Sequence, residues 1–519
     1  MDSYASVPYE SLPIPESHPE NLQALAWLFG IDAAPPDRCR VLELGCASGG
    51  NLLPMAFYLP ASRFVGIDLY ENQVAAGRAR VGALGLQNIE LRQGDIAALD
   101  AEALGTFDYV IAHGVYSWVP DAVRDRLLAL SRAVLAPAGI AFVSYNTLPG
   151  WRMRGMLRDL LRYAAGDHPV ADVKLRASRE ALERVGRAVR GLDALSARYL
   201  STEIARLRSK PDSYLFHEFL AEENRPLLFR EFVCRAGTAG LRHVCDTDLA
   251  TRYPAILGEA ADAALADLAD PLEREQYLDF VVNRNFRRSL LCRADAVLWP
   301  EPALERFEGL TLRSRLVPPR KLDLRRSRAA PFGAPDGGSV EAFHPLTKAA
   351  LVRLWELFPA GAIVSVLNAT ASAVVRQAGG AALESDHLVS ELFSLYLQGR
   401  IEAARHSAAP TGGADLGRPE VNALACLQAA EGDGQATGPR HASLALDAVS
   451  ARAVGLMDGT RTVREIAVQL GPAVDEGRPG NDRDARGRAG GVSPDEVGRW
   501  VERLVAALAR ARLLRASDG

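Results

Sequence analysis

Residues 40–146 alternate short hydrophobic runs with stretches whose apolar positions recur at helical spacing. We expect strands at 40–45, 63–68, 88–93, 107–113 and 139–145, and helices at about 51–59, 70–85, 96–104 and 121–136. Strands that alternate with helices form βαβ units around a parallel sheet. Several strands are apolar at successive positions, which is typical of a sheet covered by helices on both faces. The pattern therefore predicts an α/β, Rossmann-like fold.

The pattern changes after residue 150. Residues 151–210 are rich in Arg, Leu and Ala at helical spacing and predict a helical insertion. Strand-like runs return at 241–247 and 286–293, and we expect them to close the same sheet as an antiparallel hairpin. The first domain then spans residues 1–298, and its segment 211–298 completes the sheet.

The rest of the chain has a different composition. We interpret residues 299–342, rich in Pro, Arg and Gly, as a connector with one strand at 309–317, and residues 343–405 and 415–519 as mainly α-helical domains. The run 474–492 has few apolar residues and predicts a mobile loop.

Composition narrows the class of protein. The chain of 519 residues is 48% hydrophobic and 24% charged, with a formal net charge of −4. It has no apolar run of the roughly 18 residues that a membrane span needs, and no signal-like N-terminus. Its six cysteines form no CxxC pair, so we expect a cytoplasmic protein with reduced thiols and no metal. Residues 1–150 carry 9 Arg and no Lys against 16 Asp and Glu, which argues against nucleic-acid binding there.

The turn after the first expected strand carries the first chemical signal. Its pattern is ExGxxxG, formed by Glu43, Gly45 and Gly49, whereas the pyrophosphate of a dinucleotide favours GxGxxG. S-adenosylmethionine (SAM) has no phosphate, and it needs a backbone bend with an acidic residue near its ammonium group. Ala47 stands where the commonest form of the motif has glycine. The turn alone fits a SAM site and an ordinary tight connection equally well.

Residues at the ends of the next strands favour the SAM site. Asp68 ends the second strand, where an acidic residue can accept hydrogen bonds from ribose hydroxyls; a helix cap is its less favoured alternative. Asp95 is suited either to the adenine amino group, with Ile96 against the ring, or to capping a helix. His113 ends the fourth strand, and we do not assign it as a base.

Aromatic residues follow the fourth and fifth strands and are expected near the methyl donor. They are Tyr116, Trp118, Tyr145 and Trp151. Aromatic faces attract cations such as a sulfonium or an amine. The alternative is packing against the helical insertion, which we favour for Trp151.

The order of these segments resembles bacterial methyltransferases with a methyltransferase regulatory domain, which include rickettsial lysine methyltransferases of outer-membrane proteins. The resemblance rests on VPYESLPIPESHPENLQALAWLFG, VLELGCASGGNLLP, FDYVIAHGVYSWVP, SYNTLPGW, YLFHEFLAEENRPLLFREFV and YLDFVVNRNFRRSLLC. It implies SAM as cofactor, a segment around Tyr9 and Ser11 over the cofactor, and winged-helix-like character for 343–405. It assigns cofactor roles to Glu43, Gly45, Gly49, Asp68 and Asp95. We add their neighbours and the end of the fourth strand as candidate cofactor-binding residues, namely Cys46, Asn51, Leu69, Ile96 and His113.

The acceptor remains the open question. Our preferred hypothesis is transfer to a lysine of a protein substrate, with Tyr116, Trp118 and Tyr145 as candidates for lining the acceptor site. Alternatives are a small-molecule N- or O-methyltransferase, a nucleic-acid acceptor suggested by the basic run 315–328, and a non-catalytic SAM-binding interaction protein. We expect no membrane or nucleic-acid partner, and a homodimer is one open state of assembly.

Overall fold

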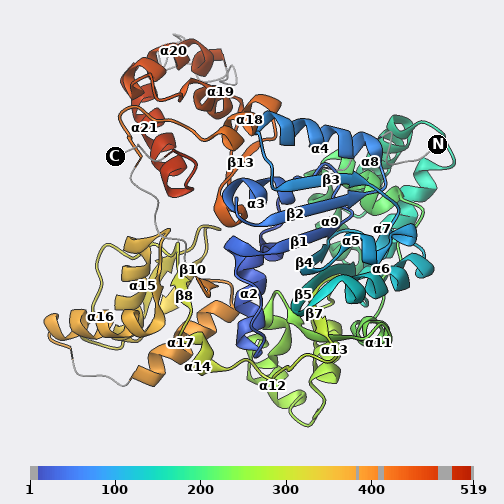
Figure 1. Ribbon diagram of the computed structural model, residues 1–519, viewed down its shortest axis with the longest axis horizontal. Coiled ribbons are helices and arrows are strands. Elements are labelled where there is room, and N and C mark those ends of the chain that lie inside the picture. Colours follow the sequence, from blue (N-terminus) through green and yellow to red (C-terminus); the bar gives the residue numbers. More distant parts are fainter. Residues whose placement is uncertain (1–6, 8–9, 381–384, 407–413, 477–493, 516–519) are drawn as a thin grey trace.

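The computed structural model describes all residues except 1–6, 8–9, 381–384, 407–413, 477–493 and 516–519. Its centre is a seven-stranded sheet with the order β3-β2-β1-β4-β5-β7-β6 (Figure 1). The strands are β1 (Arg40–Leu44), β2 (Arg63–Asp68), β3 (Ile89–Gln93), β4 (Phe107–Ala112), β5 (Leu135–Asn146), β6 (Leu241–Asp246) and β7 (Phe286–Arg293). The strands β1 to β5 pair in parallel, and β7 pairs antiparallel with both β5 and β6. The predicted Rossmann-like fold with an antiparallel closing hairpin is confirmed.

Helices cover both faces of this sheet. Side chains alternate along each strand, so Val41 belongs to one core and its neighbour Leu42 to the other. One face packs against α2 (Pro19–Leu28), α3 (Leu52–Tyr58) and α4 (Glu71–Ala83). The other face packs against α6 (Asp121–Val134) and α11 (Phe229–Thr238).

Two predicted elements differ in detail. The strand expected at 139–145 begins earlier, at Leu135, which pairs with Phe107 before a register shift, and the preceding helix therefore ends at 134. The helix expected at 96–104 is instead a 3-10 turn (Ile96–Ala98) followed by α5 (Ala101–Leu104). Asp95 and Asp100 each cap one of these turns, and two caps so close together divide the segment.

The helical insertion forms a core of its own. It contains α7 (Gly150–Ala165), α8 (Ala171–Ala188), α9 (Leu195–Arg208), α10 (Asp212–Leu215) and a π-helix, η5 (Phe216–Leu220). Leu157, Leu161, Leu182 and Ile204 are buried between these helices.

A buried ion cluster joins β6, β7 and α13 within the segment 211–298. The Arg287 guanidinium on β7 lies 2.7 Å from Asp246 on β6 and 2.8 Å from Asp279 on α13 (Pro271–Val281). Glu275, also on α13, is 3.2 Å from Arg287, and all four side chains are buried. Because β7 also pairs with β5 along Ala141–Asn146, the segment is structurally part of the sheet domain.

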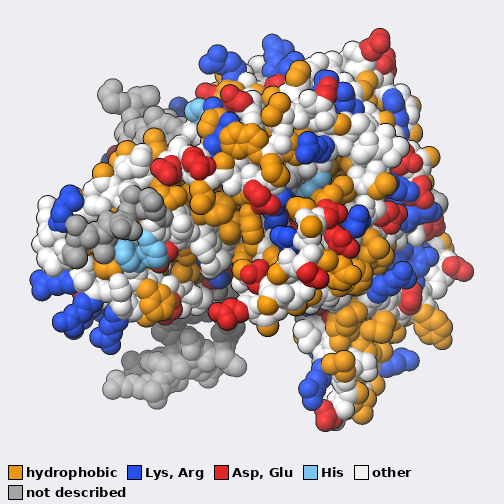
Figure 2. Space-filling model, turned by 90° about the horizontal axis from the view of Figure 1, so that it is seen from below, with side chains coloured by type: hydrophobic (Ala, Val, Ile, Leu, Met, Phe, Trp, Pro, Cys, Tyr) orange, Lys and Arg blue, Asp and Glu red, His pale blue; other side chains and the backbone are white. Residues whose placement is uncertain are grey.

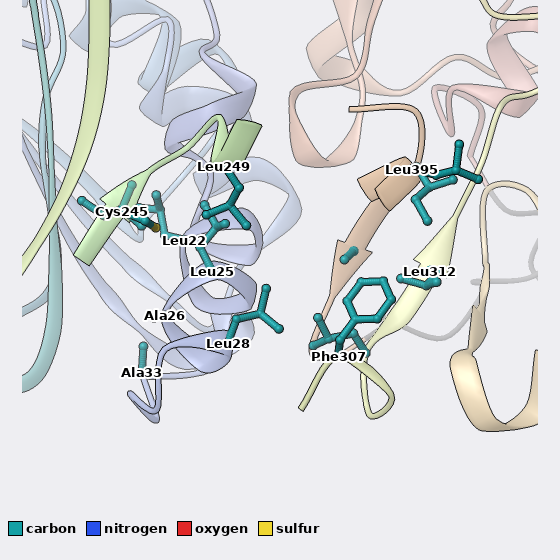
Figure 3. Close-up of a cluster of buried hydrophobic side chains, with 14 of the residues drawn as sticks. Leu22, Leu25, Ala26, Leu28, Ala33, Cys245, Leu249, Phe307, Leu312 and Leu395 are labelled. Atoms are coloured by element: carbon teal, nitrogen blue, oxygen red, sulfur yellow. The ribbon is translucent and has the colours of Figure 1, made fainter. Parts of the chain in front are cut away.

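The stretch 299–342 is more structured than the predicted connector. It contains α14 (Leu304–Phe307), β8 (Thr311–Arg313) and a hairpin of β9 (Ala330–Gly333) and β10 (Ser339–Ala342). β8 pairs with β11 (Ala362–Ile363) and β12 (Glu402–Ala404), beside α15 (Pro345–Leu357), α16 (Val364–Gln377) and α17 (Ser385–Leu397). We call residues 303–404 the middle module. Figure 3 shows Leu22, Leu25 and Leu28 of α2 on one side of a shared core and Phe307, Leu312 and Leu395 of this module on the other.

A C-terminal module follows, with a core of its own. Its elements are α18 (Ala423–Glu431), the hairpin of β13 (Gln435–Thr437) and β14 (Ser443–Ala445), α19 (Ala448–Leu456), α20 (Val463–Glu476) and α21 (Pro494–Arg510). Apart from 474–476 at the end of α20, the loop predicted at 474–492 lies outside the described residues. Among the helices that the structure describes, none combines the length and apolar character needed to cross a membrane.

Candidate active site

The turn after β1 has the sharp backbone that its sequence predicts. Gly45 and Gly49 have φ values of 78° and 76°, which favour glycine, and a Cβ on Gly45 would lie 2.2 Å from Val115 Cγ2. Ala47 also has a positive φ, 48°, at the position where the common motif has glycine. The Ala47 N–H donates to Asp68 Oδ2 at 2.8 Å, so Asp68 holds this unusual conformation in place.

Asp68 accepts hydrogen bonds from two backbone segments, the turn after β1 and the start of α4. Its second carboxylate oxygen accepts from the Tyr70 N–H at 3.0 Å, just before α4 begins. Burial raises the pKa of Asp68, while these backbone hydrogen bonds oppose the rise. Each carboxylate oxygen has a further lone pair. The predicted bond to the ribose is therefore compatible with the observed contacts and stays a prediction.

Glu43 presents a buried oxygen toward the same turn. Its Oε1 accepts from Asn51 Nδ2 at 2.8 Å, whereas Oε2 is buried and has no hydrogen-bond partner in the described part of the chain. Burial raises the pKa of Glu43 to about 8. An ammonium group beside Oε2 would supply both the missing donor and the compensating charge. The residues present thus fit the methionine end of SAM.

The N-terminal segment covers this turn. Ser11 Oγ accepts from the Gly50 N–H at 2.8 Å, and the Ile14 N–H donates to Asn51 Oδ1 at 2.9 Å. A Cβ on Gly50 would lie 1.9 Å from the Ser11 carbonyl oxygen, so only glycine permits this approach. Ser11 thus lies against the turn, its place over a bound cofactor stays a prediction, and Tyr9 is outside the described residues. Asn51 links the covering segment to Glu43.

The adjoining strand ends carry the other predicted cofactor residues. Asp95 Oδ1 accepts from the Ala97 N–H at 2.9 Å, so the capping alternative is observed, and a role for its other oxygen at adenine stays a prediction. Leu69 directly follows Asp68 and is exposed, and Ile96 directly follows Asp95 and is half-buried.

His113 is half-buried against Phe142 and Phe286, with ring centroids 6.0 and 6.1 Å apart. Its Nδ1 has no partner within the described structure. Burial, and to a lesser degree the charge of Arg288, lowers the pKa of His113 to about 4. The imidazole is therefore neutral near pH 7 and adds no positive charge at the end of β4.

The candidate acceptor-lining aromatic residues occupy different environments. Tyr116 and Tyr145 are fully buried around Phe232, and Tyr145 stacks on it with a centroid distance of 4.0 Å. The Tyr145 hydroxyl lies 3.0 Å from Ser289 Oγ. Trp118 is half-buried and meets Trp151 edge-on at 6.3 Å. Both tyrosines thus pack on the α6 and α11 face, and a role for any of the three at the acceptor stays a prediction.

Comparison with known proteins places these features in a family. The model of a "Methyltransferase domain" matches residues 41–139, and that of a "Predicted methyltransferase regulatory domain" matches residues 211–293. A third model, "PKMT, C-terminal winged helix domain", matches residues 417–513. The match at 417–513 falls on the C-terminal module, which the sequence predicted only as helical; winged-helix character for 343–405 stays a prediction.

Two uncharacterised proteins of Rickettsia prowazekii are similar in sequence. One is 40% identical over 292 residues, 56% of this chain and 53% of its own length, so the match spans about half of that relative. The other is 34% identical over 234 residues, 45% of this chain and 93% of its own length. The structure of PKMT2 from Rickettsia typhi in complex with AdoHcy superposes with a TM-score of 0.83 at 25% identity, covering 98% of this chain and 100% of that one.

We call the turn at residues 43–49 the cofactor turn. The fold, this turn and the comparisons together identify a SAM-dependent methyltransferase of class I. The chain belongs to the bacterial methyltransferases that carry a methyltransferase regulatory domain. No group of three or more His, Cys, Asp or Glu side chains placed to hold a metal ion occurs within the described ranges.

Proposed function

We propose that this enzyme transfers methyl groups from SAM to lysine side chains of a protein acceptor. The observation that carries the proposal is the likeness to PKMT2 along nearly the whole chain, with a TM-score of 0.83. That likeness includes the helical insertion, the middle module and the C-terminal module as well as the sheet domain.

A neighbouring cavity is compatible with a polypeptide acceptor. A cavity of about 1080 Å³ lies between the sheet domain, the middle module and the C-terminal module. Glu16 and Arg288, which form an ion pair, lie on its wall, and Arg288 is also the charged residue that acts on His113. Pockets for small molecules are typically about 300–1,000 Å³. The volume of this cavity is close to the upper end of that range, so the cavity is compatible with a short extended segment of a polypeptide.

The chain's own residues would act mainly by binding and placement. Bound SAM supplies an electrophilic methyl group on a positively charged sulfur. Glu43 and Asp68 would hold the methionine and ribose ends, and the segment Ser11–Ser17 would keep water from the turn. A neutral His113 would avoid repelling the cationic donor.

Lysine must lose its proton before it attacks, because its free pKa is about 10.4. Removal from water on entering the site lowers the pKa of an amine. Correct alignment of the amine with the methyl group can contribute about 7–11 kcal/mol to lowering the barrier. The proposal therefore needs no dedicated base.

Labelled SAM offered to fractionated bacterial lysate tests the proposal. We expect label in the protein fraction, and loss of transfer in Asp68→Ala, which removes the brace of the Ala47 conformation. Label confined to small molecules or to nucleic acid would refute a protein acceptor. SAM binding without transfer to any fraction would instead identify a non-catalytic interaction protein.

A further inference from the structure

A second hollow lies between the middle and C-terminal modules, away from the cofactor turn. This groove has a volume of about 730 Å³. One wall is a face of α21 on which Arg503, Ala506, Ala507 and Arg510 lie at helical spacing. The opposite wall includes Trp355 and the two residues that follow α15, Phe358 and Pro359. We call this hollow the arginine groove.

Charge in the arginine groove is almost entirely positive. Arg315, Arg440, Arg503, Arg510 and Arg512 line it, and the only acidic residue among its described lining, Glu356, is paired with Arg353 at 3.1 Å. Arg503 and Arg510 are exposed, and neither they nor the half-buried Arg512 has an ion-pair partner among the described residues. Burial and the charge of Arg313 lower the pKa of Arg512. Arg315 and Arg440 lie 3.7 and 3.9 Å from Glu402, and the charge of Glu20 acts favourably on Arg512. Within the described ranges, Arg503 and Arg510 are therefore the groove arginines without a neighbouring carboxylate in an ion pair or a favourable interaction.

This concentration of charge is local. Residues 417–513 contain 13 Arg, no Lys and 13 Asp and Glu, so the domain that supplies most of the groove is neutral overall. On the face drawn in Figure 2, acidic and basic side chains are interspersed among hydrophobic ones. A nucleic-acid-binding domain is typically basic as a whole. The pattern here favours a smaller, specific anionic partner.

We propose that the arginine groove binds an acidic polypeptide segment of the acceptor protein, a proposal that rests on the proposed function. Guanidinium groups bind carboxylates in two-pronged geometry. Trp355 and Phe358 offer an apolar wall for the aliphatic parts of such a segment. Arg315, Arg440 and Ser443 line both the arginine groove and the large cavity that reaches Glu16 and Arg288. A polypeptide held in the groove can thus continue toward the cofactor site.

The test uses the full-length enzyme and a fluorescein-labelled 16-residue peptide in which glutamates surround one lysine. A second peptide has glutamine in place of every glutamate, and a single-stranded oligothymidylate serves as an anion of another class. The test variant is Arg503→Gln with Arg510→Gln. The matched control is Arg452→Gln with Arg464→Gln, which removes the same charge from exposed positions of the same domain outside the groove.

We expect the parent and the control variant to bind the glutamate peptide about tenfold more tightly than the glutamine peptide, by fluorescence anisotropy. The groove variant should lose this preference while keeping its melting temperature. Equal binding of the two peptides by the parent would overturn the proposal. Loss of peptide binding in both double variants would also overturn the proposal. So would a higher affinity for oligothymidylate than for the glutamate peptide, if that affinity is lost in the groove variant.

A separate readout distinguishes failure of this inference from failure of the proposed function. Methyl transfer from labelled SAM into lysate protein reports the proposed function, because it needs no knowledge of the groove. Protein labelling with unchanged apparent KM in the groove variant would refute the arginine groove as a docking site and leave the lysine methyltransferase proposal standing. Absence of protein labelling by the parent would refute the proposed function itself.

Discussion

Replacing Glu43 with glutamine tests the electrostatic account of the cofactor turn. Glutamine preserves an oxygen that can accept the Asn51 hydrogen bond, but it cannot ionise. In the ligand-free protein, burial raises the pKa of Glu43 from 4.5 to about 8. Near pH 7 roughly nine-tenths of the Glu43 side chains are therefore protonated. An ammonium group at Oε2 favours the charged form, so binding should expel this proton.

Calorimetry of AdoHcy binding in buffers of different ionisation enthalpy measures this proton. At pH 7 the parent should release about 0.9 proton per ligand more than Glu43→Gln does. AdoHcy carries the same amino and carboxylate groups in both experiments, so the difference reports Glu43. Equal proton release by the two proteins would refute the assignment of Glu43 to the ammonium group.

The free energy of unfolding without ligand is a second quantity that Glu43→Gln should change. The unfolded chain ionises Glu43 near pH 4.5, whereas the folded chain does so near pH 8, so the parent loses stability as pH rises between these values. The loss is about 1.4 kcal/mol per pH unit, or about 3 kcal/mol from pH 5 to pH 7. Glu43→Gln should not show this loss. Parallel pH profiles of unfolding for the two proteins would contradict the raised pKa.

Two further substitutions probe the cover of the turn and the closing strands. Gly50→Ala places a Cβ 1.9 Å from the Ser11 carbonyl oxygen, so the affinity for AdoHcy should fall more than tenfold. The control Gly82→Ala adds a Cβ that meets no atom within 4 Å and should leave this affinity unchanged. Equal affinities of the two variants would show that the covering segment is dispensable. Arg287→Met removes the buried cation that three buried carboxylates share, and Arg284 and Arg252 still pair with two of them. The change should cost about 3–5 kcal/mol in thermal unfolding, against little for the exposed Arg242→Met. Similar melting temperatures would show that the cluster does not hold the hairpin.

Hydrophobic periodicity was sufficient to predict the sheet and its closing hairpin. Runs such as 63–68 are apolar on both faces of the strand, and Gly240 marks the start of β6. Periodicity was less informative at 299–342, because Pro, Arg and Gly dominate its composition. Phe307 and Phe332 are nevertheless fully buried, whereas Leu304 and Val317 are exposed. Short strands that pair with distant residues leave too few positions for a period to be recognised.

The candidate site was predicted in part for a similar reason. The turn and Asp68 stand out because two glycines and an aspartate occur together at the ends of two successive predicted strands. The brace from Asp68 to Ala47 and the contact between Ile14 and Asn51 join positions 21 and 37 residues apart. No local pattern encodes such pairs. For Tyr116 and Tyr145, sequence placed the residues near the sheet edge but could not decide which face of the sheet their rings occupy.

The central claim is tested most directly by identifying the methylated amino acid. Protein labelled by the enzyme and radioactive SAM would be hydrolysed completely in acid and its amino acids separated by chromatography. The account predicts that the label co-migrates with methylated lysine and is absent when Asp68→Ala replaces the parent. Label that co-migrates with another methylated amino acid, or that is released as volatile methanol from an ester, would contradict it.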